Sequence, residues 1–249
     1  MFEQEFRSAA SAGNVQKFKE YLQRVQNPNE YDSDGWNALK FASYYGYVEI
    51  IQLLFADKRI KINEPNQVGL TPFWTACQEG RIDAVRLFLK EKVDVNMACR
   101  TGETPFFIAC ENGHADVVKL LSKDERVNVN QPAYDKATPF FIACCEGKME
   151  IVKILVKDER IDINQAHKDG ASPLFIAAQN GFTEIVKLIL SSGREVNTKN
   201  MFKNQTCYEI AKLSGNGDVL KLIEGVESKG ICTFFFFKNN QIINFIIKL

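Results

Sequence analysis

The chain has 249 residues, of which 45% are hydrophobic and 25% charged, a composition that argues for a folded globular protein and against wholesale disorder. Lys plus Arg number 31 and Asp plus Glu number 31, so the formal net charge is zero. This balance argues against a general nucleic-acid binder and against a polybasic membrane anchor, because both need a surplus of cations. The N-terminal residues are acidic and lack an apolar run, and no stretch reaches the roughly 18 apolar residues of a membrane span, so we expect neither a secretory signal nor a membrane-spanning helix.

The cysteine content indicates a reducing compartment. There are seven cysteines, an odd number, without the paired spacing of a zinc site or the density of a disulfide scaffold. We therefore expect the protein in the cytoplasm, with the nucleus as the alternative.

Three series of residues recur along the chain at one interval of 33 or 34 residues. The first series consists of glycines: Gly13, Gly46, Gly80, Gly113, Gly147, Gly181 and Gly215. The second is Thr or Ser followed by proline, at Pro72, Pro105, Pro139 and Pro173. The third is a short β-like segment that ends in Asn, at 60–63, 94–96, 127–130, 161–164 and 195–197. Three series in one phase predict a tandem array of similar units.

Each unit is expected to form two helices. A hydroxyl residue before proline starts a helix, since the hydroxyl caps free backbone N–H groups and proline suits the first helical position. An apolar helix over 105–112 follows in one unit, and Gly113 is expected to end it with a positive φ. Helical spacing of apolar residues from 116 onward predicts the second helix. The Asn that closes each unit is expected to bond backbone groups of its turn.

Seven units follow one another in residues 1–226. The first, at about 2–31, lacks the Thr-Pro dipeptide and is predicted to cap the N-terminal end of the stack, because an end unit has only one neighbour. The second, at 32–65, has Asn37 and Ala38 in place of that dipeptide. The units at 66–98, 99–132, 133–166 and 167–200 carry it, and the last, at 201–226, is degenerate with Thr206 at that position. We expect one domain and a monomer.

On these motifs the chain resembles the ankyrin repeat family, over about residues 2–226. The family box Thr-Pro-Leu-His-x-Ala is matched except at the Leu-His pair, which here reads Phe73-Trp74, Phe106-Phe107, Phe140-Phe141 and Leu174-Phe175. The resemblance implies an all-α fold, an ankyrin-repeat solenoid of stacked helix-turn-helix units with β-hairpin-like turns. The box histidine of the family helps to join successive turns by hydrogen bonds, and we expect apolar stacking to replace it here.

The resemblance also implies a non-enzymatic protein–protein interaction module or scaffold. Such a module binds a partner protein through the concave face of the stack, which is made of the turn tips and first helices. The alternative is a targeting or regulatory ankyrin region of a larger enzyme or channel.

Positions that the repeat leaves free for a partner can be placed on that frame. The candidates at turn tips are Trp36, Gln67, Arg100, Glu103, Tyr134, Asp135 and Lys168. The candidates at the ends of first helices are Tyr44, Tyr45, Glu79, Glu111, Asn112, Gln179 and Asn180. The aromatic candidates Trp36, Tyr44 and Tyr45 form either a binding hot spot or a shield for the N-terminal end of the stack.

Three of these candidates are glutamates, and Glu146 at the end of another first helix is a fourth, so the set is Glu79, Glu103, Glu111 and Glu146. They form either an acidic strip for a partner with basic character or a solvated face.

No catalytic, metal-ligating or cofactor-binding constellation is recognisable, so we expect no enzyme activity, metal or cofactor. His114 follows the unit glycine and is expected to be structural, and His167 has no ligand cluster around it. Cys77, Cys110 and Cys144 occupy one small-residue position of successive first helices and are expected to be packing residues. Cys145 is the repeat cysteine to test for reactivity.

The segment 227–249 departs from the repeat, being rich in Phe, Ile and Asn. Three interpretations stay open: a cap over the last unit, a contact with a membrane or partner, or translation of A/T-rich noncoding DNA.

Overall fold

The structure is a computed structural model that describes residues 2–199, 202–203 and 205–227. Across those residues the chain forms 14 helices, and the one β-type pairing is an isolated bridge between Phe202 and Gln205. The chain divides into two compact units, residues 1–139 and 140–249. The all-α stack expected from the sequence is confirmed. The segment predicted as a tail lies, from residue 228 onward, outside the described residues.

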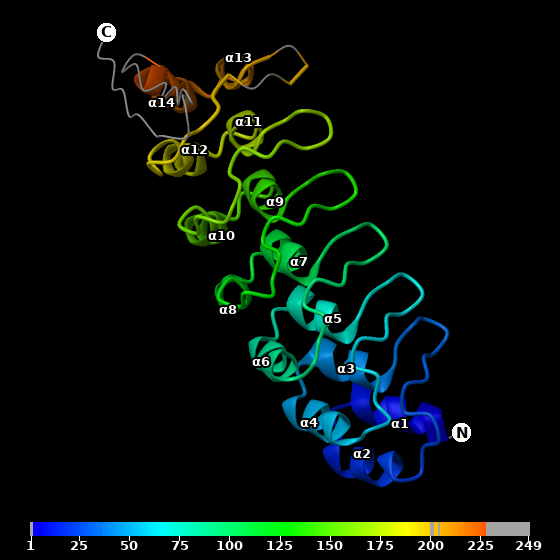
Figure 1. Cartoon of the computed structure of the whole chain (residues 1–249). Helices are drawn as coiled ribbons and strands as arrows, with labels where there is room; N and C mark the ends of the chain where they lie inside the picture. The colour runs from blue at the N-terminus through cyan, green and yellow to red at the C-terminus, as the bar shows by residue number, and fades with distance from the viewer. Residues whose placement is uncertain (1, 200–201, 204, 228–249) are drawn as a thin grey trace, which may run out of the picture. The chain divides into compact units, whose positions relative to one another are not determined.

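The first unit is built from two rows of helices (Figure 1). First helices form one row, in which each packs on the next: α1 (Phe2–Ser11), α3 (Ala38–Tyr45), α5 (Pro72–Gln78) and α7 (Pro105–Asn112). Second helices form the other row: α2 (Val15–Leu22), α4 (Val48–Ala56), α6 (Ile82–Lys90) and α8 (Ala115–Leu121). The loops between repeats project from the side of the first helices (Figure 1). This side of the first unit therefore carries both the loop tips and the first-helix row.

The second unit repeats this arrangement. Its first helices are α9 (Pro139–Cys145), which begins at the unit boundary, α11 (Pro173–Gln179) and α13 (Cys207–Leu213). Its second helices are α10 (Met149–Leu155), α12 (Thr183–Leu190) and α14 (Gly217–Glu227). Helix α11 packs on α13, and α12 packs on both α10 and α14.

The predicted helix starts are confirmed. The hydroxyl oxygen of Thr104 accepts a hydrogen bond from the backbone N–H of Phe107 at 3.1 Å, and Thr71 and Ser172 cap their helices in the same way. Asn37, which replaces Thr-Pro in the second repeat, accepts from the N–H of Lys40 at 2.8 Å. An amide oxygen is thus as good a cap as a hydroxyl here, which is why α3 forms without the dipeptide.

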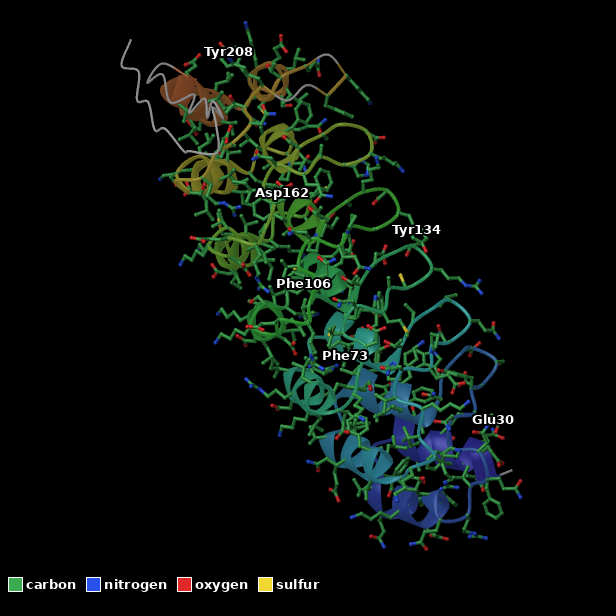
Figure 2. All side chains as sticks on the ribbon, in the orientation of Figure 1. Glu30, Phe73, Phe106, Tyr134, Asp162 and Tyr208 are labelled. Carbon is green, nitrogen blue, oxygen red and sulfur yellow. The ribbon has the colours of Figure 1, made fainter. Side chains whose placement is uncertain are left out.

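Small side chains let the first helices approach one another, while phenylalanine fills the space between the two rows. Ala42, Ala76 and Ala109 are fully buried at equivalent positions, and Cys77 and Cys110 follow them. The rings of Phe73 and Phe106 lie among the helices (Figure 2), fully buried. Burying such a side chain is worth about 1.5–3 kcal/mol.

The segments that end in Asn are turns and not the β-like segments that we expected, as the bonds made by their asparagines explain. The side chain of Asn96 donates to the carbonyl of Arg126 at 2.7 Å and accepts from the N–H of Asn128 at 2.8 Å. Asn63 makes the same pair of bonds to Lys92 and Asp94 in the next repeat. The same pattern continues at Asn164 in the second unit. These asparagines join each turn to the following one, whereas the sequence indicated bonding within a turn.

The residues at the position of the box histidine also differ in part from expectation. Phe107 and Phe141 are buried there, as apolar stacking predicts. Trp74, however, donates from its indole Nε1 to the carbonyl of Glu103 at 3.0 Å. The expectation that apolar contact alone would replace the histidine is therefore wrong at this repeat, since the indole N–H joins it to the next turn.

Left-handed backbone marks both the helix ends and the turn tips. Gly113, which ends α7, has φ +81°, as predicted. At the turn tips Gly102 has φ +91°, but the fifth repeat places Lys136 at the equivalent position with φ +67°. A side chain disfavours this conformation, so Lys136 is a strained position.

Candidate functional site

The turn tips of the first unit are closed by backbone bonds and joined to each other. In one tip the N–H of Cys99 donates to the carbonyl of Glu103 at 3.0 Å, which gives the hairpin-like closure expected for these turns. Between tips, the N–H of Arg100 donates to the carbonyl of Val68 at 3.2 Å, and that of Tyr134 donates to Thr101 at 3.1 Å. Backbone bonds therefore join three successive tips into a row, and the side chain of Asn66 links the tip before them by donating to the carbonyl of Gly35 at 3.2 Å.

Large apolar side chains are exposed on this row. Tyr134 is 79% exposed and stands at the tip of its loop (Figure 2), and Val68 is 51% exposed. Among the other candidates at these tips, Gln67 and Arg100 are exposed, whereas Asp135 is half-buried. The row thus offers both apolar and polar side chains to solvent.

Five rings of the second repeat form an aromatic strip: Trp36, Phe41, Tyr44, Tyr45 and Tyr47. The ring centroids of Trp36 and Phe41 lie 4.9 Å apart, and those of Trp36 and Tyr44 lie 5.3 Å apart. The strip continues from Tyr44 to Tyr45 at 4.9 Å and from Tyr45 to Tyr47 at 5.4 Å. The structure thus brings the three predicted aromatic residues into direct contact. Tyr45 is 42% exposed, while Trp36 and Tyr44 are half-buried.

A buried cation supports the strip from behind. Lys40, at the position of the box histidine, is only 4% exposed, and its ammonium lies 4.3 Å from the centre of the Trp36 ring. Loss of solvation lowers the pKa of Lys40, an effect that the carboxylate of Asp32 opposes. The contact shows that this indole can bind a cation on its face.

A cavity of about 620 Å³ adjoins the strip at Phe41. The rest of its lining is mixed polar and apolar and comes from α1, the residue after it and the turn before Trp36: Gln4, Arg7, Ser8, Ser11, Ala12, Tyr31, Asp32 and Ser33. Arg7 lies 3.6 Å from the carboxylate of Glu30, so its charge is balanced. The phenol of Tyr31 donates to the carbonyl of Glu64 at 2.8 Å, and burial, with Glu64 nearby, raises its pKa to about 12.

The remaining candidates of the first unit lie at the ends of first helices or beside the tips. Glu79 and Glu111 are half-buried, and Asn112 is exposed. The side chain of Asn112 also donates to the carbonyl of Gln78 at 3.3 Å, so this residue has a structural contact. Glu103 is half-buried, and a carboxylate oxygen of it accepts from the thiol of Cys99 at 3.5 Å.

Three candidates lie in the second unit. Lys168 is exposed at a turn tip, and Gln179 is half-buried at the end of α11. Asn180 is exposed, and its side chain donates to the carbonyl of Cys145 at 3.1 Å, a bond equivalent to that from Asn112 to Gln78 in the first unit. The two asparagines therefore have structural contacts that their sequence position did not reveal.

Sequence reasoning missed Lys40, Phe41 and Tyr47 as members of the aromatic surface. Tyr47 directly follows the unit glycine, as His114 does. Its ring lies within 2.7 Å of the point where a β-carbon on Gly13 would stand. A ring after the glycine, with rings at the end of the preceding helix, is the signal that could have found it.

The described residues hold no group of three or more side chains that could bind a metal ion. His114 has the predicted structural role, since its Nε2 lies 2.7 Å from the carbonyl of Gln78. Cys77 and Cys110 are buried, and loss of solvation raises the pKa of both thiols well above the usual value. Such thiols are inert packing groups. Cys145 is half-buried, and its reactivity stays a prediction.

Comparison with known families accounts for most of the chain. A family model described as ankyrin repeats (3 copies) matches residues 59–132 and 123–200, and one described as ankyrin repeats (many copies) matches residues 6–55. No curated protein matches the sequence. Repeats of this family are generally protein–protein interaction modules and typically have no catalytic activity. Within the described part of the chain, every helix is too short or too polar to cross a membrane.

Proposed function

The chain belongs to the ankyrin repeat family, and from this premise we propose that it is a non-enzymatic scaffold that binds a partner protein through the turn tips and first-helix ends of residues 1–139. This is the face that the family resemblance predicts to be concave. Lys168, Gln179 and Asn180 hold the corresponding positions in the second unit. We place the protein in the cytoplasm as a monomer.

The observation that carries the proposal is the aromatic strip. Aromatic residues are over-represented among the residues that dominate binding energy at protein interfaces. The rings of Trp36, Tyr44 and Tyr45 already pack on one another, so a partner has little side-chain freedom to remove when it binds. Their partial exposure leaves surface for a partner to bury.

The row of turn tips supports the same proposal. Backbone bonds between Val68 and Arg100 and between Thr101 and Tyr134 hold the tips in register before any partner arrives. A preformed surface lowers the ordering cost of association. Exposed Val68 and Tyr134 add apolar area along this row.

A pull-down with the full chain tests the proposal. The wild type is compared with the triple variant Trp36→Ala/Tyr44→Ala/Tyr45→Ala and with Lys119→Ala/Lys123→Ala, a matched change on and after second helix α8. We expect the aromatic variant to lose its specific partner by at least about tenfold, since each hot-spot ring contributes more than about 1 kcal/mol. The lysine variant should recover partners like the wild type.

Two controls separate binding from folding. Far-UV circular dichroism and a thermal melt show whether the triple variant keeps the fold. The single variant Tyr45→Ser removes one ring of the strip. Tyr45 is the most exposed of the three predicted aromatic residues, so its loss should disturb packing the least. Equal recovery of every partner by wild type, triple variant and Tyr45→Ser would reject the proposal.

A further inference from the structure

We propose that the occupant of this face is a basic segment of the partner protein, an extended stretch whose arginine side chains stack on the aromatic strip and pair with carboxylates beside it. The inference rests on the proposed function and narrows it to one class of partner. Three observations lead to it: a local excess of acid, a ring of the strip that already holds a cation, and the position of Glu79 next to the strip.

The acidic excess is local, because the whole chain has 31 basic and 31 acidic residues. The turn tips and first-helix ends of residues 1–139 carry five carboxylates: Asp34, Glu79, Glu103, Glu111 and Asp135. The cations on or beside this face are Arg100, Lys136 and Arg81. Four further charges near this face offset one another: Arg7 lies 3.6 Å from the carboxylate of Glu30, and buried Lys40 is opposite in charge to nearby Asp32. The face therefore keeps a net negative charge.

Part of this charge is available to a ligand. Neither Asp34 nor Glu79 forms an ion pair within the part of the chain that the structure describes. Arg81 is held by its own bond, in which its Nε donates to the carbonyl of Tyr44 at 2.7 Å. A negative surface steers a cationic partner toward it and disfavours acidic competitors.

Trp36 shows the mode of recognition. Its ring already has the Lys40 ammonium 4.3 Å from its centre, and that lysine belongs to the core. Lys40 already occupies the face of Trp36, so an incoming cation must stack on another ring of the strip. Tyr45 is the most exposed of the three predicted aromatic residues and is therefore the expected contact. A guanidinium suits this surface better than an ammonium, because it is planar, weakly hydrated and able to stack on a ring while it forks toward a carboxylate.

The position of Glu79 supplies that carboxylate. Tyr45 ends α3, and Glu79 stands at the equivalent position directly after α5, the helix that packs on α3. Packed helices lie about 8–10 Å apart. An extended segment in the polyproline II conformation advances about 3.1 Å per residue with three residues per turn, so arginines at every third position would point to one side and match the repeat spacing.

The test uses synthetic peptides and the full chain. The probe is a short peptide with arginine at every third position and Ser and Gly between. Lysine, citrulline and glutamate versions are the controls, of which citrulline keeps the shape of arginine without its charge. Calorimetric titration measures the affinity of each peptide. Tryptophan fluorescence reports on the site through Trp36, since the other tryptophan, Trp74, is only 4% exposed. The variant Trp36→Phe shows how much of the fluorescence change comes from Trp36.

We expect the arginine peptide to bind and the lysine peptide to bind several-fold more weakly. The affinity of the citrulline peptide should be lower than that of the arginine peptide by at least about tenfold, because a charge-assisted pair is lost. Tyr45→Ser and Glu79→Gln should each reduce the affinity for arginine several-fold, and Glu79→Gln should flatten the salt dependence. Glu125→Gln, a matched change in the turn after α8, should have no effect.

Binding of the citrulline or glutamate peptide as tight as that of the arginine peptide would overturn the proposal, as would absence of binding. Arginine-peptide binding that neither Tyr45→Ser nor Glu79→Gln weakens would also overturn it. None of these results affects the pull-down. Loss of a partner in the aromatic variant, together with failure here, would keep the face as a binding site and reject the basic segment.

Discussion

The imidazole ring of His114 lies directly over Gly80. A β-carbon on Gly80 would stand 2.5 Å from Nδ1 of that ring. The same relationship joins Phe182 to Gly147 in the second unit, at 2.8 Å, and Tyr47 to Gly13 in the first. In these repeats the residue after the glycine packs on the glycine of the preceding repeat, so the glycine provides space as well as a left-handed turn.

Gly80→Ala should therefore destabilise the first unit more than Gly46→Ala does. Both glycines have positive φ, which costs an alanine roughly 1–2 kcal/mol. At Gly46 the nearest obstacle is Cδ of Arg81 at 3.1 Å, which needs to move only slightly, whereas at Gly80 it is the His114 ring at 2.5 Å, which must shift much further. Overpacking adds about 1–3 kcal/mol. Urea unfolding of both variants measures the difference, and equal losses would show that backbone strain alone acts.

Lys136→Gly should stabilise the protein. Lys136 has φ +67° at a position where other repeats have glycine. Relief of this strain should contribute up to about 1 kcal/mol. Lys136→Ala is the matched control, because it removes the same charge and keeps the strained φ. The midpoint of thermal unfolding should rise for glycine and not for alanine, and a rise for both would assign the effect to charge.

Asn96→Ala should weaken the junction between two turns. The side chain makes a bond of 2.7 Å to the carbonyl of Arg126 and one of 2.8 Å to the N–H of Asn128. Loss of both bonds should cost about 1–3 kcal/mol. Amide hydrogen exchange should show faster exchange at Asn128 in particular. Gln67→Ala, at an exposed tip, serves as the control and should stay within about 0.5 kcal/mol of the wild type.

Asp124→Asn should destabilise the protein at neutral pH and not in acid. The side-chain hydrogen bonds from Arg126, which lies 2.6 Å away, lower the pKa of Asp124 in the folded state. Because the pKa of Asp124 is lower in the folded than in the unfolded state, its carboxylate stabilises the folded protein. This stabilisation is fully present above the unfolded-state pKa of about 3.9 and is lost as the pH falls through the folded-state pKa.

The expected size of this effect is at most about 1 kcal/mol, because the pair is partly exposed. The free energies of unfolding of wild type and Asp124→Asn should differ at pH 7 and converge in strong acid. A difference that persists unchanged in acid would mean that the carboxylate acts through shape and not through charge.

Period and capping chemistry predicted most of the fold. The glycine and Thr-Pro series placed both helices of each repeat, and the hydroxyl caps at Thr71, Thr104 and Ser172 follow from local geometry. The inter-repeat bonds of Asn96 and the indole bond of Trp74 were beyond such reasoning. Both join residues about one repeat apart in sequence, whereas propensity describes only neighbours along the chain.

The candidate face was predictable in position but not in composition. Trp36, Tyr44 and Tyr45 share a face because the repeat frame places them there. The membership of Phe41 and Tyr47 depends on ring packing across the end of α3 and the turn after it. The partial burial of Glu79 and Glu111, and the bond from Asn112 to Gln78, likewise depend on how side chains settle against the neighbouring repeat.

The row of turn tips has a consequence for engineering. Since Val68 is joined to Arg100, and Thr101 to Tyr134, through main-chain atoms, these links between loops do not depend on the side chains at the four positions. Residues 67, 68, 100, 101 and 134 can then be randomised together as a library, with the helices as an unchanged frame. The molecule is in this respect ready for directed evolution toward new targets.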